Sequence, residues 1–180
     1  MANNDTFGTA HSLKFVELCN FVLERESSAY RFVDHRIAQI TGEEEIAQIE
    51  QAINGVLKPV SQHMERALTL LSDRKSPDYR NSIKESISAV EAICGVIAGR
   101  RNATLGQALD KVEKKVKLHP ALKEAFDKLY GYTSSGDGIR HALLQQTDLG
   151  FADAKFMLVA CSAFVNYLTS KSSDAGLSLS

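Results

Sequence analysis

The stretch Ser76-Pro-Asp-Tyr-Arg-Asn-Ser-Ile-Lys-Glu-Ser-Ile-Ser-Ala-Val-Glu-Ala-Ile-Cys94 decides the fold class. Its opening Ser-Pro-Asp is a strong helix-start signal. Apolar residues then recur at the spacing of an amphipathic helix and form one wide face, made of Ile83, Ile87, Val90, Ile93, Cys94 and Ile97. We therefore predict a long helix over residues 78–98 at the centre of a helical bundle.

Further helical patterns lie on both sides of this segment. They cover residues 12–26, 43–53, 59–72, 120–131 and 152–169, and another helix starts at the capping box of Thr104 and Gln107. His119-Pro120 opens one of these helices, and Gly131 is expected to close it. The helix over 152–169 is apolar nearly all round, which indicates either deep burial or a partner surface.

Two short β-prone runs interrupt the helical pattern. Tyr30–Val33 and Ile37–Ile40 are separated by Asp34-His-Arg36, which predicts a small hairpin. The predicted fold is all-α, a helical bundle with a minor N-terminal β-hairpin. Its expected divisions are a disordered N-terminus over 1–10, a helix, hairpin and helix over 11–58, the bundle over 59–170 and a disordered tail over 171–180.

Length, charge and cysteine content narrow the function classes. A chain of 180 residues that is 44% hydrophobic can bury the core of one principal domain. The net charge of -1 argues against a generally basic nucleic-acid binder, so any RNA contact needs a local patch. Cys19, Cys94 and Cys161 lie in helical patterns without a C-x-x-C pair and are read as reduced core thiols. Without an apolar run of membrane-span length or a signal-peptide core, a cytoplasmic location is expected.

The most suggestive chemistry follows a glycine-bearing loop. In Gly136-Asp-Gly-Ile-Arg-His141, Asp137 can cap a short helix whose first turn presents Arg140 and His141. A guanidinium suits phosphate or carboxylate, and an imidazole exchanges protons near neutral pH. The pair therefore suggests phosphate chemistry. The alternative is structural, with Arg140 paired to an acid such as Asp137 or Glu91 and His141 on a helix surface.

Several segments resemble a known family. The segments 76–94, Thr104–Leu109, His119–Phe126, Leu129–Tyr132 and Asp137–Ala142, with the closing helix, resemble the C-terminal helical domain of AbiJ-type abortive-infection proteins, a branch of the HEPN superfamily. Leu23–Val33 and Ile46–Glu50 resemble the segment that leads into that domain. The resemblance implies a dimerising helical bundle used in antiviral defence, and often a metal-independent endoribonuclease. It also implies an additional N-terminal domain, which this chain is expected to lack.

The catalytic motif implied by the resemblance is incomplete. It consists of an arginine, a polar residue directly after it, and a histidine separated from the arginine by four to six residues. Arg140 and His141 match the first two positions, whereas the third would fall on Gln145, Gln146 or Thr147. None of these can act as a general base near neutral pH. His141 could replace the missing histidine only if the geometry brought it to the substrate, because neighbouring helix residues point about 100° apart.

The best local basic patch lies between Arg100 and Lys123. It contains Arg100, Arg101, Lys111, Lys114, Lys115, Lys117 and Lys123, which outnumber Asp110 and Glu113. Such a patch could follow an RNA backbone, although a charge run is more often a solvated helix face. Tyr132 could stack an unpaired base, and Tyr130 is expected to pack in the core or the loop. Glu91 is the acid expected to pair with Arg140, the alternative being an ordinary solvent-facing glutamate.

Other classes of site lack their sequence patterns. His11, His35, His63, His119 and His141 show no metal-ligand spacing, so neither a metal nor another cofactor is expected. Two functions remain open. The first is a dimerising, RNA-binding defence module with an incomplete ribonuclease motif, and the second is an active metal-independent endoribonuclease that uses Arg140 and His141. The expected partners are a second copy of the chain, RNA and a separately encoded sensor or antitoxin protein, with no membrane.

Overall fold

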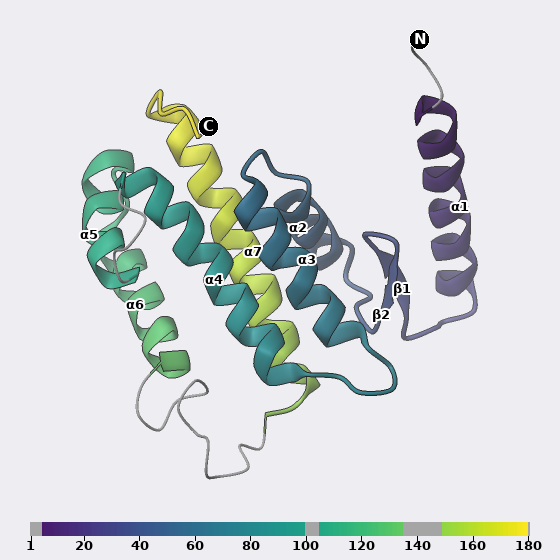
Figure 1. Cartoon of the computed structure of the whole chain (residues 1–180). Coiled ribbons are helices and arrows are strands. Elements are labelled where there is room, and N and C mark those ends of the chain that lie inside the picture. Colours follow the sequence, from purple (N-terminus) through teal and green to yellow (C-terminus); the bar gives the residue numbers. More distant parts are fainter. Residues whose placement is uncertain (1–4, 100–104, 135–148, 180) are drawn as a thin grey trace.

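The computed structural model describes residues 5–99, 105–134 and 149–179. This part of the chain forms seven helices and one antiparallel hairpin, which confirms the expected all-α fold with a minor N-terminal hairpin (Figure 1). The elements in chain order are α1 (Asp5–Arg25), β1 (Arg31–Val33), β2 (Arg36–Ala38), α2 (Glu43–Ile53), α3 (Lys58–Ser72), α4 (Tyr79–Ala98), α5 (Leu105–Val116), α6 (Pro120–Ser134) and α7 (Phe151–Asp174).

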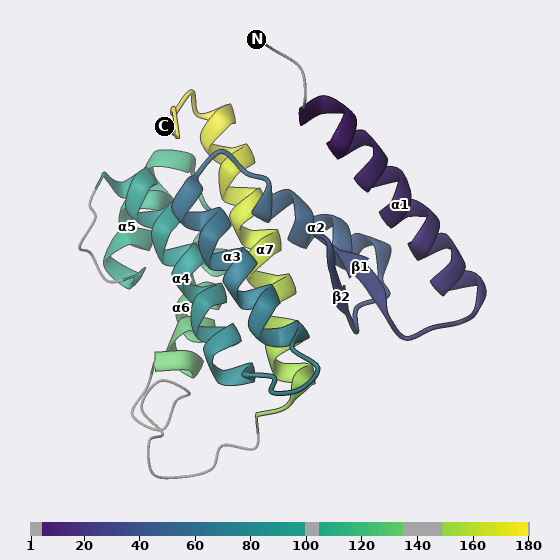
Figure 2. The same cartoon turned by 45° about the vertical axis from the view of Figure 1, so that its right-hand side comes forward.

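Helix α4 is the centre of the bundle, as its apolar face predicts. It packs against α3, α7 and α5, and both views show it beside α3 and α7 (Figure 1, Figure 2). Asp78 caps its start by accepting a hydrogen bond at Oδ1 from the Asn81 backbone N–H at 3.0 Å. Gly99 ends it with φ of 70°, a left-handed conformation that glycine adopts without the Cβ penalty.

Helix α7 forms the other half of the core. Its buried residues include Met157, Leu158, Cys161, Val165 and Leu168. Deep burial therefore accounts for most of its apolar character, although Phe156 is 60% exposed. Among the described helices, α7 has the length and apolar composition of a membrane-spanning helix. This corrects the expectation that the sequence contains no apolar run of that length. A core helix passes the same test, and half of this apolar window is buried.

Three helix ends differ from the predicted ones. Helix α1 begins at Asp5 and not near Ser12, α6 continues through Gly131 to Ser134, and α7 extends to Asp174. A glycine inside a helix costs about 1 kcal/mol relative to alanine. Leu129 and Tyr130, just before Gly131, pack against the core, and this burial offsets the cost.

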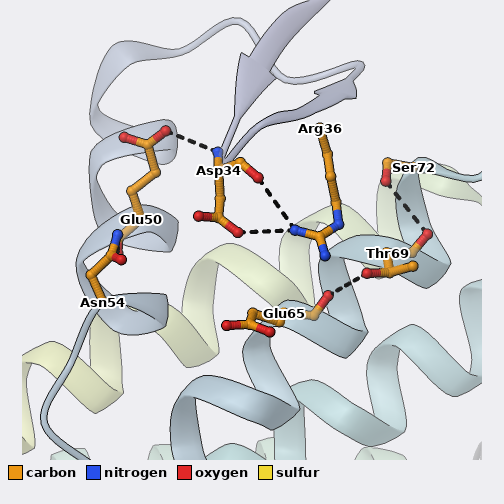
Figure 3. Close-up of polar contacts among 7 residues, drawn as sticks. All are labelled: Asp34, Arg36, Glu50, Asn54, Glu65, Thr69 and Ser72. Atoms are coloured by element: carbon orange, nitrogen blue, oxygen red, sulfur yellow. Dashed lines mark hydrogen bonds and ion pairs between the residues drawn. The ribbon is translucent and has the colours of Figure 1, made fainter. Parts of the chain in front are cut away.

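The hairpin is shorter than predicted and turns tightly. Asp34 and His35 have φ of 42° and 61°, and positive φ at both central residues is the requirement of a type I′ turn. Figure 3 shows how this turn is held: Glu50 Oε1 on α2 accepts the Asp34 backbone N–H at 3.0 Å, and Arg36 pairs with the Asp34 carboxylate at 2.9 Å. Val33 and Ala38 are buried and anchor the strands to the bundle.

Helix α1 stands away from the bundle and, among the described elements, contacts β1 (Figure 2). The Asn20 side chain exchanges two hydrogen bonds with the Phe32 backbone, at 2.7 and 3.0 Å. The apolar spacing of α1 predicts a helix, but it does not predict what the helix packs against. The hairpin covers one side of α1, and large apolar residues stay exposed on the rest of the helix. These are Leu13, Phe15, Leu18, Phe21 and Val22.

The cysteines follow the prediction in part. Cys94 and Cys161 are buried free thiols, whereas Cys19 on α1 is half-buried. Burial raises the pKa of both Cys94 and Cys161 to about 12. The two core thiols are therefore neutral and unreactive in the folded protein.

Candidate nucleic-acid interface

The predicted catalytic pair lies outside the described residues, and so do Arg100 and Arg101. The chain on either side of residues 135–148 is described. Helix α6 ends at Ser134, Leu149 and Gly150 lead into α7, and both of these helix ends lie at the same end of the bundle (Figure 1, Figure 2). The described chain on both sides of residues 135–148 therefore lies at the end of the bundle at which α7 begins.

Glu91 lies on α4 and is half-buried. It comes twelve residues after Tyr79, the first residue of α4, which corresponds to roughly 18 Å along the helix. Its side chain lines an apolar groove together with Leu57, Pro59 and Val60 from the start of α3. The predicted Arg140–Glu91 pair stays a prediction, since Arg140 lies outside the described residues.

The basic patch divides into structural and exposed lysines. Lys123 on α6 pairs with Asp110 and lies 3.7 Å from Glu113, both on α5. Lys115 donates from Nζ to the carbonyl oxygen of Ile97, at 2.7 Å, near the end of α4. Lys111 is half-buried, and Lys114 and Lys117 are exposed. Lys114 and Lys117 are thus the patch residues best placed to meet a ligand.

The ion pair between Lys123 and Asp110 reduces the positive charge that Lys123 offers to a ligand. The hydrogen bond from Lys123 holds the pKa of Asp110 below its usual value, and the same bond raises the pKa of Lys123. Both groups therefore stay ionised as a pair near neutral pH, and Lys123 contributes little unmatched positive charge.

The described lysines of the patch and the start of α7 lie near opposite ends of α4. Tyr79, at the start of α4, packs edge-on against Phe151 at the start of α7, with ring centroids 6.3 Å apart. Ile97, which accepts the hydrogen bond of Lys115, comes eighteen residues later on α4. At 1.5 Å per residue this is roughly 27 Å. A stacked nucleic-acid strand with the B-form rise of 3.4 Å per nucleotide would need about eight nucleotides to span this distance.

Tyr132 lies at the end of α6 that leads into residues 135–148. It is 49% exposed, whereas Tyr130 is partly buried against the core, as expected. A half-exposed tyrosine ring offers one face on which an unpaired base can stack. Tyr132 therefore stays a candidate for base stacking.

A cavity between the hairpin and the bundle is not among the sites predicted from the sequence. Tyr30, Gln39, Arg74, Tyr79 and Phe151 line it, together with neighbouring residues. These residues come from four separate parts of the chain, and only the fold brings them together. The sequence carries no spacing signal that could have identified the cavity.

No group of three or more potential metal ligands occurs within the described ranges 5–99, 105–134 and 149–179. The candidate interface residues there are lysines and Tyr132. These groups bind phosphates and stack on bases without a metal ion.

Comparison with known proteins links the N-terminal part of the chain to phage defence. Residues 2–55 match the family model described as AbiJ N-terminal domain 4, which belongs to an abortive-infection family. No curated protein and no solved structure matches the chain. The match covers α1, the hairpin and α2, the region interpreted from the sequence as a leading segment. The expectation that the chain lacks an AbiJ-type N-terminal domain is therefore wrong, and the match supports an abortive-infection role.

Proposed function

We propose that this protein is an abortive-infection defence protein whose helices α3 to α7 form a HEPN-like module that binds RNA without cleaving it. The family match at residues 2–55 supports the defence role. The single observation that carries RNA binding is the pair of exposed lysines, Lys114 and Lys117, at the end of α5. They extend a positively charged surface into solvent at one end of the bundle, where a phosphate backbone can approach.

The absence of cleavage follows from the motif itself. A metal-independent ribonuclease needs a base to activate the ribose 2′-hydroxyl and an acid to protonate the leaving oxygen. His141 can serve one of these steps, and Gln145, Gln146 and Thr147 cannot serve the other. Arg140 stays useful without catalysis, because a guanidinium binds phosphate with two parallel hydrogen bonds.

The helix α6 gives a path for the RNA. It starts just after Lys117 and ends just after Tyr132, so it joins the lysines to the stacking candidate. Its fifteen residues span roughly 22 Å, about six to seven nucleotides of a stacked strand with the B-form rise. The lysines would neutralise phosphates at one end, and Tyr132 would stack a base at the other.

Fluorescence anisotropy with labelled single-stranded RNA over a salt series tests this function. We expect the double variant Lys114→Glu with Lys117→Glu to weaken binding tenfold or more for all RNA sequences alike. The slope of log affinity against log salt concentration should decrease by roughly 1.4, since each phosphate contact on a single strand contributes about 0.7. The matched control is Lys58→Glu with Lys84→Glu, which makes the same charge change at exposed lysines on α3 and α4. Equal behaviour of the two double variants would refute RNA binding at α5.

The second candidate function is an active endoribonuclease. The observation in its favour is that Arg140 and His141 occupy the first two motif positions. In that case Arg140 would stabilise charge on the scissile phosphate, and His141 would assist attack by the ribose 2′-hydroxyl, leaving a cyclic phosphate. Cleavage in the presence of EDTA separates this candidate from the first.

The proposed assembly is a homodimer formed through the surface near Arg140 and α7. The exposure of Phe156 near the start of α7 supports it. This side chain is 60% exposed, and covering it with a partner would stabilise the dimer by removing apolar surface from water. A cytoplasmic location and a separately encoded sensor or antitoxin protein belong to the same proposal.

A further inference from the structure

A cavity of about 250 Å³ lies between the hairpin and the bundle. The hairpin side contributes Tyr30, Ile37 and Gln39, the connection between α3 and α4 contributes Asp73 and Arg74, and Tyr79 and Phe151 begin α4 and α7. Pockets for drug-sized ligands usually have roughly 300 to 1,000 Å³. This cavity is smaller, so it suits a single ring system with one or two substituents.

The cavity presents aromatic surfaces from both sides. On the hairpin side the Arg74 guanidinium lies over the Tyr30 ring, with Cζ 5.4 Å from the ring centroid. On the bundle side Tyr79 and Phe151 pack edge to face at an interplanar angle of 75°. Aromatic rings and a guanidinium plane are the groups on which proteins stack flat heterocycles.

The polar groups of the cavity supply both hydrogen-bond donors and acceptors. Asp73 Oδ1 accepts the backbone N–H groups of Lys75 and Ser76, at 2.9 and 3.0 Å. These bonds lower the pKa of Asp73, so the carboxylate is ionised and its second oxygen can accept from a ligand. Gln39 is exposed and offers an amide that both donates and accepts.

Arg74 adds a positive charge. Within the described residues its guanidinium forms no ion pair, and it lies over the Tyr30 ring. The contact with the ring leaves the N–H groups of the guanidinium able to donate to a phosphate.

We propose that this cavity binds one unpaired nucleobase with its attached phosphate. The base would stack between the tyrosine rings, Asp73 and Gln39 would read its donor and acceptor edge, and Arg74 would hold the phosphate. The second oxygen of Asp73 accepts from an N–H group, and guanine, which presents both a ring N–H and an amino group at one edge, offers it more donors than adenine does. The base comes either from an RNA strand, in which case the site deepens the proposed function, or from a free nucleotide.

The test uses the full chain with two probes, GMP and a single-stranded RNA that contains one guanosine among uridines, titrated by NMR or calorimetry. Stacking of one base contributes about 1 to 3 kcal/mol, so Tyr30→Leu should weaken binding roughly tenfold. Arg74→Ala removes the hydrogen bonds to the phosphate and should weaken binding by a similar factor. Asp73→Asn should reduce the preference for GMP over AMP. Arg66→Ala is the matched control, because Arg66 is an exposed arginine on α3 that does not line the cavity. Thermal unfolding of each variant checks that it folds.

The outcomes separate the two sources and the two proposals. Binding of GMP and RNA with similar affinity, lost in Arg74→Ala and kept in Arg66→Ala, assigns a free nucleotide. Binding of the RNA alone, with the same dependence on Arg74 and Tyr30, assigns an RNA base. If neither probe distinguishes Arg74→Ala from Arg66→Ala, the cavity proposal is overturned. RNA binding that still depends on Lys114 and Lys117 would then leave the proposed function standing.

Discussion

Lys115 donates a hydrogen bond from its ammonium group to the carbonyl oxygen of Ile97, at 2.7 Å, and so ties the last turn of α5 to the last turn of α4. The last carbonyl groups of a helix have no partner within it, and a cation there also interacts favourably with the helix dipole. This contact makes Lys115 a structural residue within a run of lysines whose neighbours Lys114 and Lys117 face solvent.

The first prediction separates these lysines by stability. Lys115→Ala should lower the free energy of unfolding by about 1 to 2 kcal/mol, because it removes a hydrogen bond from a charged donor and a favourable charge at the end of α4. Lys114→Ala should change it by less than about 0.5 kcal/mol. Urea denaturation followed by circular dichroism measures both. Equal losses in the two variants would show that the contact with Ile97 contributes nothing.

The second prediction concerns the start of α4. Asp78→Ala should cost about 1 kcal/mol of stability, because the Asn81 backbone N–H loses the carboxylate that accepts its hydrogen bond. Asp78→Ser should keep most of this stability, since serine is also a good N-cap. Thermal denaturation of the three proteins provides the comparison, and an alanine variant as stable as the serine variant would contradict the prediction.

The third prediction concerns alkaline pH. The thiols of Cys94 and Cys161 have pKa values raised by burial from 9.0 to about 12, and for Cys94 the nearby carboxylates of Glu91 and Asp127 add to the effect. The unfolded protein releases these protons near pH 9 and the folded protein does not. This contribution to stability is therefore fully present below pH 9 and is lost as the pH rises toward about 12, at about 1.4 kcal/mol per pH unit for each thiol.

Denaturation at several pH values between 8 and 11 measures this loss. Cys161→Val should flatten the pH dependence, because it removes one of the two buried thiols. Cys19→Ser is the matched control and should keep the wild-type dependence, since Cys19 is half-buried on α1. The same curve for all three proteins would mean that other groups, such as lysines, cause the entire effect.

The fourth prediction tests the proposed dimer. Light scattering of the wild type should give the mass of two chains. The protein concentration should be on the order of tens of micromolar, the range in which weak dimers form. Phe156→Lys should yield monomers, since it places a charge in the proposed interface. Phe21→Lys makes the same change at an exposed apolar residue of α1. If Phe21→Lys dissociates the dimer and Phe156→Lys does not, the interface lies on α1.

The parts of the fold that could be predicted from the sequence are mainly helices whose starts are marked by local residues. The cap at Asp78, the proline at 59 and the three acids at the start of α2 each act within one helical turn, and the helices α2, α3 and α4 begin where they predict. The continuation of α6 past Gly131 depends on the packing of Leu129 and Tyr130, which no local pattern contains.

The candidate site could be predicted less well than the helices, because it also depends on packing between distant parts of the chain. A run of lysines shows that charge is present, but the hydrogen bond from Lys115 to Ile97 depends on how α5 packs on α4. The cavity beside Tyr30 needs the hairpin, the connection around Arg74 and the start of α7 in one place. Tertiary packing determined both features.

The most direct test of the central claim, RNA binding without cleavage, is incubation of purified wild-type protein with single-stranded RNA and EDTA, with the ends of all products identified. The account predicts bound RNA and no cleavage above that of Arg140→Ala, because Gln145 and Gln146 cannot move a proton as the missing histidine would. Metal-independent cleavage that leaves 2′,3′-cyclic ends, and that falls roughly a hundredfold in both Arg140→Ala and His141→Ala, would contradict it.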